Sequence, residues 1–466
     1  MSAVKWASVL TSANPSSSYR TSMAYDGTNI ILFGGSSSET YMSETWKWNG
    51  TTWTQVFLDT SPSGRNGASM AYDGTNIILF GGFDGNRYND TWKWNGSNWT
   101  QLSPVSSPSV RSAASMAYDG SNIILFGGFD GYTCLNDTWK WDGSNWTQLS
   151  PESSPPVRSA ASMVYDGTNI ILFGGANNYD SLNDTWKWTG TTWTQVFPDT
   201  SPSTRADASM AYDGTNIILF GGGSSETWKW TETNWIQLSP AASPPVRSAS
   251  SMAYDGSNLI VFGGYSGGLV TDTWRLCTVP GAPVGTVTPG NKQATVSWKA
   301  PNNGGLPITG YTVTVTPGNK TVTSTKTSTT ITGLTAGTLY TFAVTATNAV
   351  GVSQSMSKTA TTWAVPGAPA GVTATAGKGS ATVSWKAPAN GGSPITGYTV
   401  TVIPGNKTVT STKTSTTISG LSVGKKYTFA VTAKNIVGTS PSASSKPVTL
   451  KASFPITNVI RKPIAF

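Results

Sequence analysis

Hydrophobic and polar positions follow the same order six times along the first 280 residues. Each copy has a short strand-like segment, an Asp-Gly turn and four apolar residues in succession. Five copies then have two tryptophans separated by a lysine. The turn aspartates, from Asp26 to Asp255, lie 47, 46, 47, 47 and 42 residues apart. This period predicts a propeller or solenoid, whose units cannot bury their cores alone.

The third copy predicts four strands. Residues 112–118 read as the first strand, and Asp119-Gly120 reads as a tight turn because glycine tolerates positive φ. The apolar run 123–126 suits a strand that is buried on both faces. Residues 139–141, Trp-Lys-Trp, place both tryptophans on one face of a third strand, and Trp146 marks a fourth. Four antiparallel strands per copy are typical of a propeller blade.

Three features recur at fixed places in the copies: an arginine before the first strand, Gly-Gly after the second, and spaced tryptophans in the third and fourth. The Gly-Gly pairs stand at 34–35, 81–82, 127–128, 174–175, 221–222 and 263–264. These features resemble the kelch repeat over residues 1 to about 278. The resemblance implies a six-bladed β-propeller. The resemblance does not indicate which function the chain has, since kelch proteins bind proteins, bind sugars or catalyse reactions.

The sixth copy lacks a fourth strand. It has Trp274, then Leu276 where the second tryptophan should stand, and it ends there. Near the N-terminus, Trp6 lies in a segment that matches the fourth strand of the first copy, residues 52–56, with no first three strands before it. We therefore predict that a strand at residues 4–9 closes the last blade and removes two open sheet edges.

Composition changes at residues 279–281, and two segments with a repeat of 87 residues follow. Their Thr/Val-rich strands and Gly, Pro and Asn turns predict β-sandwiches. Residues 294–298 and 340–344, with their equivalents 381–385 and 427–431, resemble the fibronectin type III domain, an immunoglobulin-like sandwich. That resemblance implies that Trp298 and Trp385 lie in the cores. It also implies that Tyr340 and Tyr427 form corner hydrogen bonds.

The fold class predicted is therefore all-β: a six-bladed kelch-like β-propeller plus two immunoglobulin-like sandwiches. The predicted domains are the propeller at 1–278, fibronectin type III domains at 279–363 and 364–450, and a C-terminal tail at 451–466.

Charge is divided between the two halves. Residues 1–280 contain 22 Asp and Glu against 14 Lys and Arg, whereas residues 281–466 contain 16 Lys and Arg and no acid. A purely basic half should attract an anionic surface polymer at residues 280–466. The alternative is that two duplicated domains simply share a low-charge surface. Specific nucleic-acid binding is not expected, because the lysines are scattered among threonines without evident aromatics for base stacking.

Histidine is absent from the whole chain. This excludes Ser/His/Asp and Cys/His nucleophile systems and imidazole metal sites, so we expect no catalytic residue, no metal and no cofactor. The copper-radical oxidases that resemble kelch propellers are excluded for the same reason. A carboxylate stands two residues before the first third-strand tryptophan in every copy, which favours a structural role. The non-repeated acids Glu39, Asp180 and Glu232 leave open a sialate-mutarotase-like kelch enzyme that would use a Glu and an Arg.

The predicted binding face is the side of the propeller that carries the loops after Gly-Gly and the entries to the first strands. Variable loops on a rigid scaffold commonly carry recognition, and Tyr and Arg suit a glycan or protein ligand. The arginines stand five residues before the repeated Met, and Arg20 breaks this register. The alternative is that each Arg pairs with a blade carboxylate and holds neighbouring blades. The candidate ligand-binding residues are Arg65, Arg111, Arg158, Arg205, Arg247, Tyr41, Tyr88, Tyr132, Tyr179 and Tyr265.

These observations favour an extracellular or cell-surface, non-enzymatic binding or adhesion protein. The propeller would bind the ligand, and the basic sandwiches would act as spacer and anchor. The alternative is a structural subunit of an extracellular filament or virion that self-assembles through the tail 451–466. Residues 1–10 do not read as a secretion signal, and no run of apolar residues approaches the ~18–20 that span a membrane.

Overall fold

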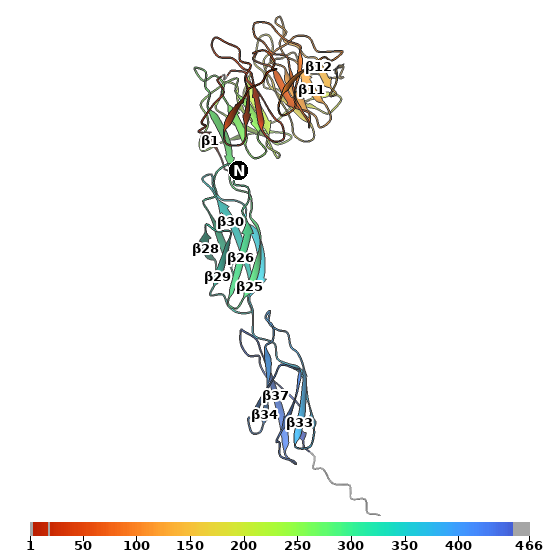
Figure 1. The fold of residues 1–466 in the computed structure, drawn as a ribbon, viewed down its shortest axis with the longest axis vertical. Helices are drawn as coiled ribbons and strands as arrows, with labels where there is room; N and C mark the ends of the chain where they lie inside the picture. Colours follow the sequence, from red (N-terminus) through yellow and green to blue (C-terminus); the bar gives the residue numbers. More distant parts are fainter. Residues whose placement is uncertain (1–2, 17–18, 451–466) are drawn as a thin grey trace, which may run out of the picture. The chain divides into compact units, whose positions relative to one another are not determined.

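The computed structural model describes residues 3–16 and 19–450 (Figure 1). Every regular element in this part of the chain is a β-strand, so the predicted all-β class is confirmed. The chain divides into two compact units, built mainly on residues up to Pro280 and on residues from Gly281 onward. The prediction that the tail 451–466 mediates assembly lies outside the described residues.

Five blades are sheets of four consecutive antiparallel strands. The first three blades are β2 (Ser22–Tyr25), β3 (Ile30–Phe33), β4 (Thr45–Trp48) and β5 (Trp53–Val56); β6 (Ser69–Tyr72), β7 (Ile77–Phe80), β8 (Thr91–Trp94) and β9 (Trp99–Leu102); and β10 (Ser115–Tyr118), β11 (Ile123–Phe126), β12 (Thr138–Trp141) and β13 (Trp146–Leu149). The next two are β14 (Ser162–Tyr165), β15 (Ile170–Phe173), β16 (Thr185–Trp188) and β17 (Trp193–Val196); and β18 (Ala208–Tyr212), β19 (Ile217–Gly221), β20 (Thr227–Trp230) and β21 (Trp235–Leu238).

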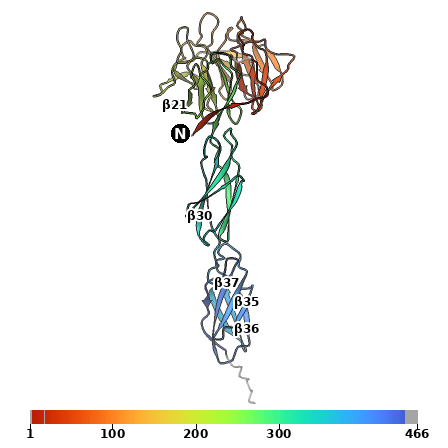
Figure 2. The same cartoon turned by 90° about the vertical axis from the view of Figure 1, so that its left-hand side faces the viewer.

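The sixth blade takes its outer strand from the other end of the propeller. Its strands are β22 (Ser251–Tyr254), β23 (Leu259–Phe262) and β24 (Thr273–Thr278), and β1 (Val4–Val9) pairs antiparallel with β24. Trp6 lies opposite Leu276 in this pairing and is fully buried. Figure 2 shows the red N-terminal strand against the green strands of this blade. The ring is thus closed by hydrogen bonds between residues about 270 positions apart in sequence.

The second strand of each blade is an apolar run that is buried along its whole length, because the faces of neighbouring blades cover it on both sides. The fourth-strand tryptophan links each blade to the one before it. Its indole N–H donates to the hydroxyl of a buried third-strand threonine at 2.9–3.1 Å, and its ring packs on a phenylalanine of that blade. The six bonds are Trp6–Thr227, Trp53–Thr273, Trp99–Thr45, Trp146–Thr91, Trp193–Thr138 and Trp235–Thr185.

A closed circle of backbone hydrogen bonds joins the six entries to the first strands. One residue per blade adopts φ between 51° and 57°, and its N–H donates to the carbonyl of the equivalent residue in the preceding blade at 2.8–3.1 Å. The six residues are Arg20, Gly67, Ala113, Ala160, Asp207 and Ala249. Five of them are not glycine, so the circle holds L-residues in the left-handed region at a conformational cost.

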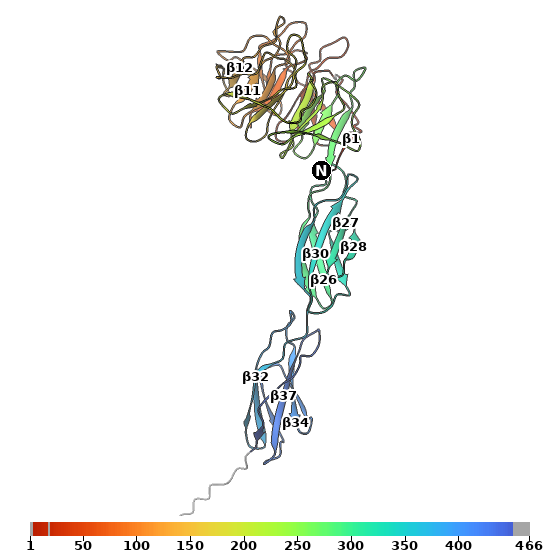
Figure 3. The same ribbon diagram turned by 180° about the vertical axis from the view of Figure 1, so that it is seen from behind.

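Each fibronectin-like segment is a sandwich of two sheets (Figure 3). The first has β25 (Val284–Gly290), β26 (Gln293–Lys299) and β29 (Ser328–Thr332) against β28 (Lys320–Ser324), β27 (Gly310–Thr316), β30 (Leu339–Thr347) and β31 (Met356–Thr361). The second has β32 (Ala370–Ala376), β33 (Ser380–Lys386) and β36 (Ser415–Ser419) against β35 (Thr408–Ser411), β34 (Gly397–Ile403), β37 (Lys426–Lys434) and β38 (Ala443–Ser444), with β39 (Val448–Thr449) also on β37.

The tryptophans and tyrosines on which the fibronectin type III resemblance rests occupy the core and corner positions that it implied. Trp298 and Trp385 are buried, and each ring packs edge-on against a tyrosine at a centroid distance of 5.2–5.3 Å. The hydroxyl oxygens of Tyr340 and Tyr427 accept hydrogen bonds from main-chain amides five residues upstream, at 3.0 and 3.1 Å. These contacts fix the corners of the two sandwiches.

Replacing Trp6 with Ala should destabilise the propeller, because it leaves a cavity in the sixth blade and strands the Thr227 hydroxyl. The expected loss in the free energy of unfolding is about 3–5 kcal/mol, measured by denaturant titration. Leu10→Ala is the matched control, since Leu10 is 96% exposed and its loss should leave stability unchanged. Equal stability of the Trp6 variant and the control would contradict the closure by β1.

Candidate functional site

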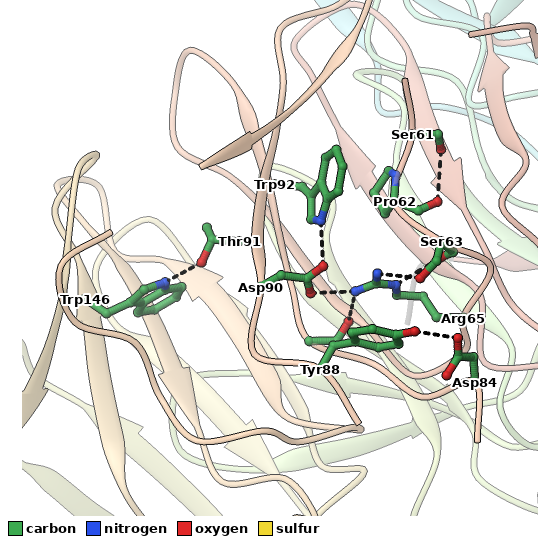
Figure 4. Close-up of polar contacts among 11 residues, drawn as sticks. Ser61, Pro62, Ser63, Arg65, Asp84, Tyr88, Asp90, Thr91, Trp92 and Trp146 are labelled. Carbon is green, nitrogen blue, oxygen red and sulfur yellow. Dashed lines mark hydrogen bonds and ion pairs between the residues drawn. The ribbon is translucent and has the colours of Figure 1, made fainter. Parts of the chain in front are cut away.

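In five of the six blades, the entry to the first strand carries an arginine that bridges two blades, and Arg20 in the first blade is the exception. At Arg65, Nη1 donates to Asp90 Oδ1 at 2.6 Å and to the Gly81 carbonyl at 3.1 Å, both in the second blade (Figure 4). Its main chain bonds to the first blade instead: the N–H donates to the Met42 carbonyl, and its carbonyl accepts from the Gly35 N–H. One residue therefore ties the two blades together through its side chain and its backbone.

The same arrangement recurs at four further boundaries. Each guanidinium pairs with a carboxylate 21–26 residues later and donates to the carbonyl of the first glycine in the Gly-Gly pair. Each carboxylate also accepts the indole N–H of the tryptophan two residues on. The pairs are Arg111–Asp137, Arg158–Asp184, Arg205–Glu226 and Arg247–Asp272, with N···O distances of 2.6–2.8 Å.

The electrostatic effect of these pairs shows in the carboxyl pKa values. Burial alone would raise the pKa of Asp137, Asp184 and Asp272, but the hydrogen bonds and charge of the paired arginines outweigh it and lower each pKa below its ordinary value. The hydrogen bond from Arg205 likewise lowers the pKa of Glu226. All four carboxyls therefore stay ionised at neutral pH, each partly exposed and paired with a buried arginine.

These contacts correct the predicted binding face. Arg65, Arg111, Arg158, Arg205 and Arg247 are only 1–2% exposed, and their guanidinium groups are occupied by protein acceptors. The alternative in which each Arg pairs with a blade carboxylate is the one that the structure contains. Because a ligand cannot reach these groups, we leave the five arginines out of the binding face.

The predicted tyrosines differ in exposure and fall into three groups. Tyr88 is half-buried: its ring lies over the Arg65 guanidinium at 3.9 Å, and its hydroxyl donates to Asp84. It therefore supports the arginine and is also removed from the binding face. Tyr41 and Tyr265 are partly exposed, at 38% and 49%, whereas Tyr132 and Tyr179 are 95% and 91% exposed.

The loops that carry Tyr132 and Tyr179 are tied to each other. In loop 176–183, the Asn178 side chain accepts from the Cys134 N–H at 2.8 Å and donates to the Thr133 hydroxyl at 2.9 Å. Within each loop, a carboxylate or amide oxygen two residues before the tyrosine accepts its N–H. These bonds order the loop backbones and leave both tyrosine rings in solvent. Reasoning from the sequence did not single out Asn178, because only the fold brings these loops together.

The axial opening holds a charged pair that the sequence did not reveal. Arg20 Nε and Nη2 donate to Asp207 Oδ1 and Oδ2 at 3.0 and 2.7 Å, beside a hollow of about 110 Å³ lined largely by alanines. Their side chains are 30% and 21% exposed. Alignment of the copies could have found Asp207, because it shares its repeat position with Ala113 and Ala160.

The comparisons with known families agree with this geometry. A model of the KLHDC2/KLHL20/DRC7 Kelch-repeats domain matches residues 95–228 and 142–281, and a fibronectin type III model matches residues 282–363 and 367–451. The chain is a kelch-repeat propeller followed by two fibronectin type III domains.

Curated relatives resemble the fibronectin type III part of the chain. Chitinase A1 of Niallia circulans is 37% identical over 192 residues, which cover 39% of this chain and 26% of that protein. Endoglucanase B of Cellulomonas fimi is 36% identical over 184 residues, covering 35% and 17%. Exoglucanase B of the same species is 32% identical over 206 residues, covering 41% and 18%. The match spans about a quarter or less of each relative, and it assigns no catalytic group to the kelch propeller.

Within residues 3–16 and 19–450, no group of three or more Cys, Asp or Glu side chains is placed to hold a metal ion. The same residues include no helix that is long and apolar enough to cross a membrane. The non-repeated acids Glu39, Asp180 and Glu232 form no ion pair with an arginine in this part of the kelch propeller.

The paired carboxylates predict an acid-sensitive fold. Their folded-state pKa values lie below the unfolded ones, so they contribute stability above about pH 4 and lose it as pH falls through the folded pKa. Asp137→Asn should cost about 3 kcal/mol at pH 7, because the Arg111 charge stays buried without its partner. The difference from the unmodified chain should shrink below pH 4. Urea unfolding from pH 3 to pH 8 measures this.

Glu39→Gln is the control for that titration, because Glu39 is exposed and pairs with no arginine among the described residues. It should unfold like the unmodified chain at every pH. A constant difference between the Asp137 variant and the unmodified chain down to pH 3 would show that the ion pair is not the cause.

Proposed function

We propose that this chain is an extracellular, non-enzymatic binding protein whose propeller loops bind a polysaccharide. The observation that carries the proposal is the pair of almost fully exposed tyrosines, Tyr132 and Tyr179, on loops tied together by Asn178. A tyrosine ring can cover the apolar face of a sugar while its hydroxyl stays hydrated. Because the loops are already ordered, binding costs little conformational entropy.

The chemistry of the loops favours a glycan over a protein ligand. Most side chains around the two tyrosines are uncharged Asn, Thr and Ser. The charged exceptions are the exposed Asp180, Arg87 beside Gly131, and Asp130, which caps its own loop. Hydroxyl and amide groups match the hydrogen-bonding surface of a neutral polysaccharide. The fibronectin type III relatives also bear the names of a chitinase, an endoglucanase and an exoglucanase, which supports a role near such polymers.

The fibronectin type III pair serves as spacer and anchor in this proposal. Residues 281–450 contain 13 lysines, all of them exposed, and no acid. All the ion pairs found among the described residues lie in the propeller. The sandwich lysines therefore face solvent without neutralising partners, which favours an anionic polymer on the cell surface.

Replacing Tyr132 and Tyr179 together with Ala should weaken binding to the preferred polysaccharide about a hundredfold. Each ring is expected to contribute about 1.5 kcal/mol through burial of apolar area, which is about tenfold in Kd. Depletion assays with insoluble chitin and cellulose, followed by affinity electrophoresis with soluble glycans, measure the loss. Phe197→Ala is the control, since Phe197 is 81% exposed but lies outside the tyrosine loops. Unchanged binding by the double variant would refute the assignment of this site.

The fibronectin type III pair, expressed alone, should be retained on a heparin or wall-phosphate resin at low ionic strength and elute as salt rises. The reason is that the Debye length shrinks from about 30 Å at 0.01 M to about 8 Å at 0.15 M, so scattered lysines act together only at low salt. The isolated propeller, which has a net charge of −8, should pass through. The anchor role needs retention that persists at 0.15 M salt, which scattered lysines cannot give and clustered lysines can; loss of all binding at that salt concentration would rule the anchor role out.

A further inference from the structure

A cavity of about 510 Å³ lies between the fourth and fifth blades of the propeller. It opens beside the β14–β15 turn and the β20–β21 turn, which lie at the opposite edge of the blades from the tyrosine loops. Charged and aromatic side chains line it: Asp166, Lys187, Tyr212, Trp230 and Glu232. Its volume is within the range of small-molecule sites, about 300–1,000 Å³.

Glu232 marks the fifth blade as different from its copies. The turn between the third and fourth strands has glycine at this position in the first four blades, with φ of 93–96° at Gly50, Gly96, Gly143 and Gly190. Glu232 adopts φ of 70° in the same place. An L-residue in this region costs about 1 kcal/mol relative to glycine. The blade fold therefore does not require this carboxylate, and its presence beside a cavity calls for another role.

The lining offers polar groups that the protein itself does not use. In the first four blades the first-strand tyrosine donates its hydroxyl to the glycine carbonyl two residues on, at 2.8–3.0 Å. The equivalent Tyr212 hydroxyl has no such bond, and no described residue bonds to the Lys187 ammonium or the Glu232 carboxylate. The buried Trp230 indole N–H also lacks a partner, as do those of Trp94, Trp141 and Trp188 at the same repeat position, so it is a free donor in this lining but does not by itself distinguish this cavity. Asp166 uses one oxygen, Oδ1, to cap its turn.

The charges of these groups indicate the ligand. Two carboxylates, Asp166 and Glu232, face one ammonium, Lys187, so the lining carries a net negative charge and suits a ligand with one positive charge. Tyr212, Trp230 and the ammonium can donate to hydroxyl oxygens. A divalent metal is a poor candidate, because no three Cys, Asp or Glu side chains among the described residues gather around one point.

We propose that this cavity binds an amino sugar with a free ammonium group. The carboxylates of Glu232 and Asp166 would accept charge-assisted hydrogen bonds from the ammonium, and Lys187 and Tyr212 would bond to the sugar hydroxyls. This site is separate from the tyrosine loops, so the proposal does not depend on the polysaccharide site described above.

The test is calorimetric titration of the full chain with D-glucosamine, D-glucose, N-acetyl-D-glucosamine and spermidine. Glucosamine should bind at least tenfold more tightly than the two neutral sugars, which lack the charge, and than spermidine, which lacks the hydroxyls. Equal binding of glucose would overturn the role of the carboxylates, and equal binding of spermidine would overturn the sugar assignment. No binding of glucosamine at millimolar concentration would overturn the site itself.

Glu232→Gly is the decisive variant, because it restores the residue that four sister blades carry and so keeps the turn intact. It should weaken glucosamine binding at least tenfold, while the melting temperature stays equal or rises. Glu39→Gln, on a loop after a Gly-Gly pair, is the matched control and should bind like the unmodified chain. If the Glu232 variant binds glucosamine as tightly as the control, the proposal is wrong.

Discussion

The hydrogen bond from a fourth-strand indole to a threonine hydroxyl of the preceding blade is the contact on which this propeller depends. A four-stranded blade has two apolar faces, and neither is stable in water unless a neighbour covers it. The indole supplies both the ring that fills the boundary and the N–H that satisfies the buried threonine, as at Trp146 and Thr91. Because the ring needs six such contacts, the sixth blade must borrow Trp6 from the start of the chain.

The fold class was predictable from the sequence because its signals are local and repeated. Asp-Gly turns, Gly-Gly pairs and apolar runs recur at one period, so six weak patterns reinforce one another. The partners of the arginines were not predictable in the same way. Arg111 and Asp137 stand 26 residues apart, and only the blade geometry decides whether the guanidinium faces a carboxylate or a ligand. The same limit applies to the tyrosines: Tyr88 and Tyr132 occupy similar loops, but one contacts Arg65 and the other contacts solvent.

The positions that the copies share and the positions in which they differ have separate roles. The shared arginines pair with the shared carboxylates, the fourth-strand tryptophans bond to the shared threonines, and all of these residues are buried or partly buried. The copy-specific residues lie at edges: Tyr132 and Tyr179 on loops, Glu232 in an outer turn, and Arg20 with Asp207 at the axis. In the circle of backbone hydrogen bonds at the entries to the first strands, main-chain bonds hold each residue whatever its side chain is. Arg20 and Asp207 can therefore stand where the other copies have Ala or Gly. The buried residues that all copies share thus maintain the blade structure, and the residues at loops, turns and the axis can differ from copy to copy.

The way in which β1 completes the sixth blade has a mechanical consequence. The chain leaves the propeller from β24, and β24 is an inner strand with β1 on one side and β23 on the other. Tension applied through the fibronectin type III domains would therefore load two ladders of hydrogen bonds at once. Had the chain ended on an edge strand, the same pull could peel that strand away one bond at a time. The N-terminal strand thus acts as a clamp on the point where force enters the propeller.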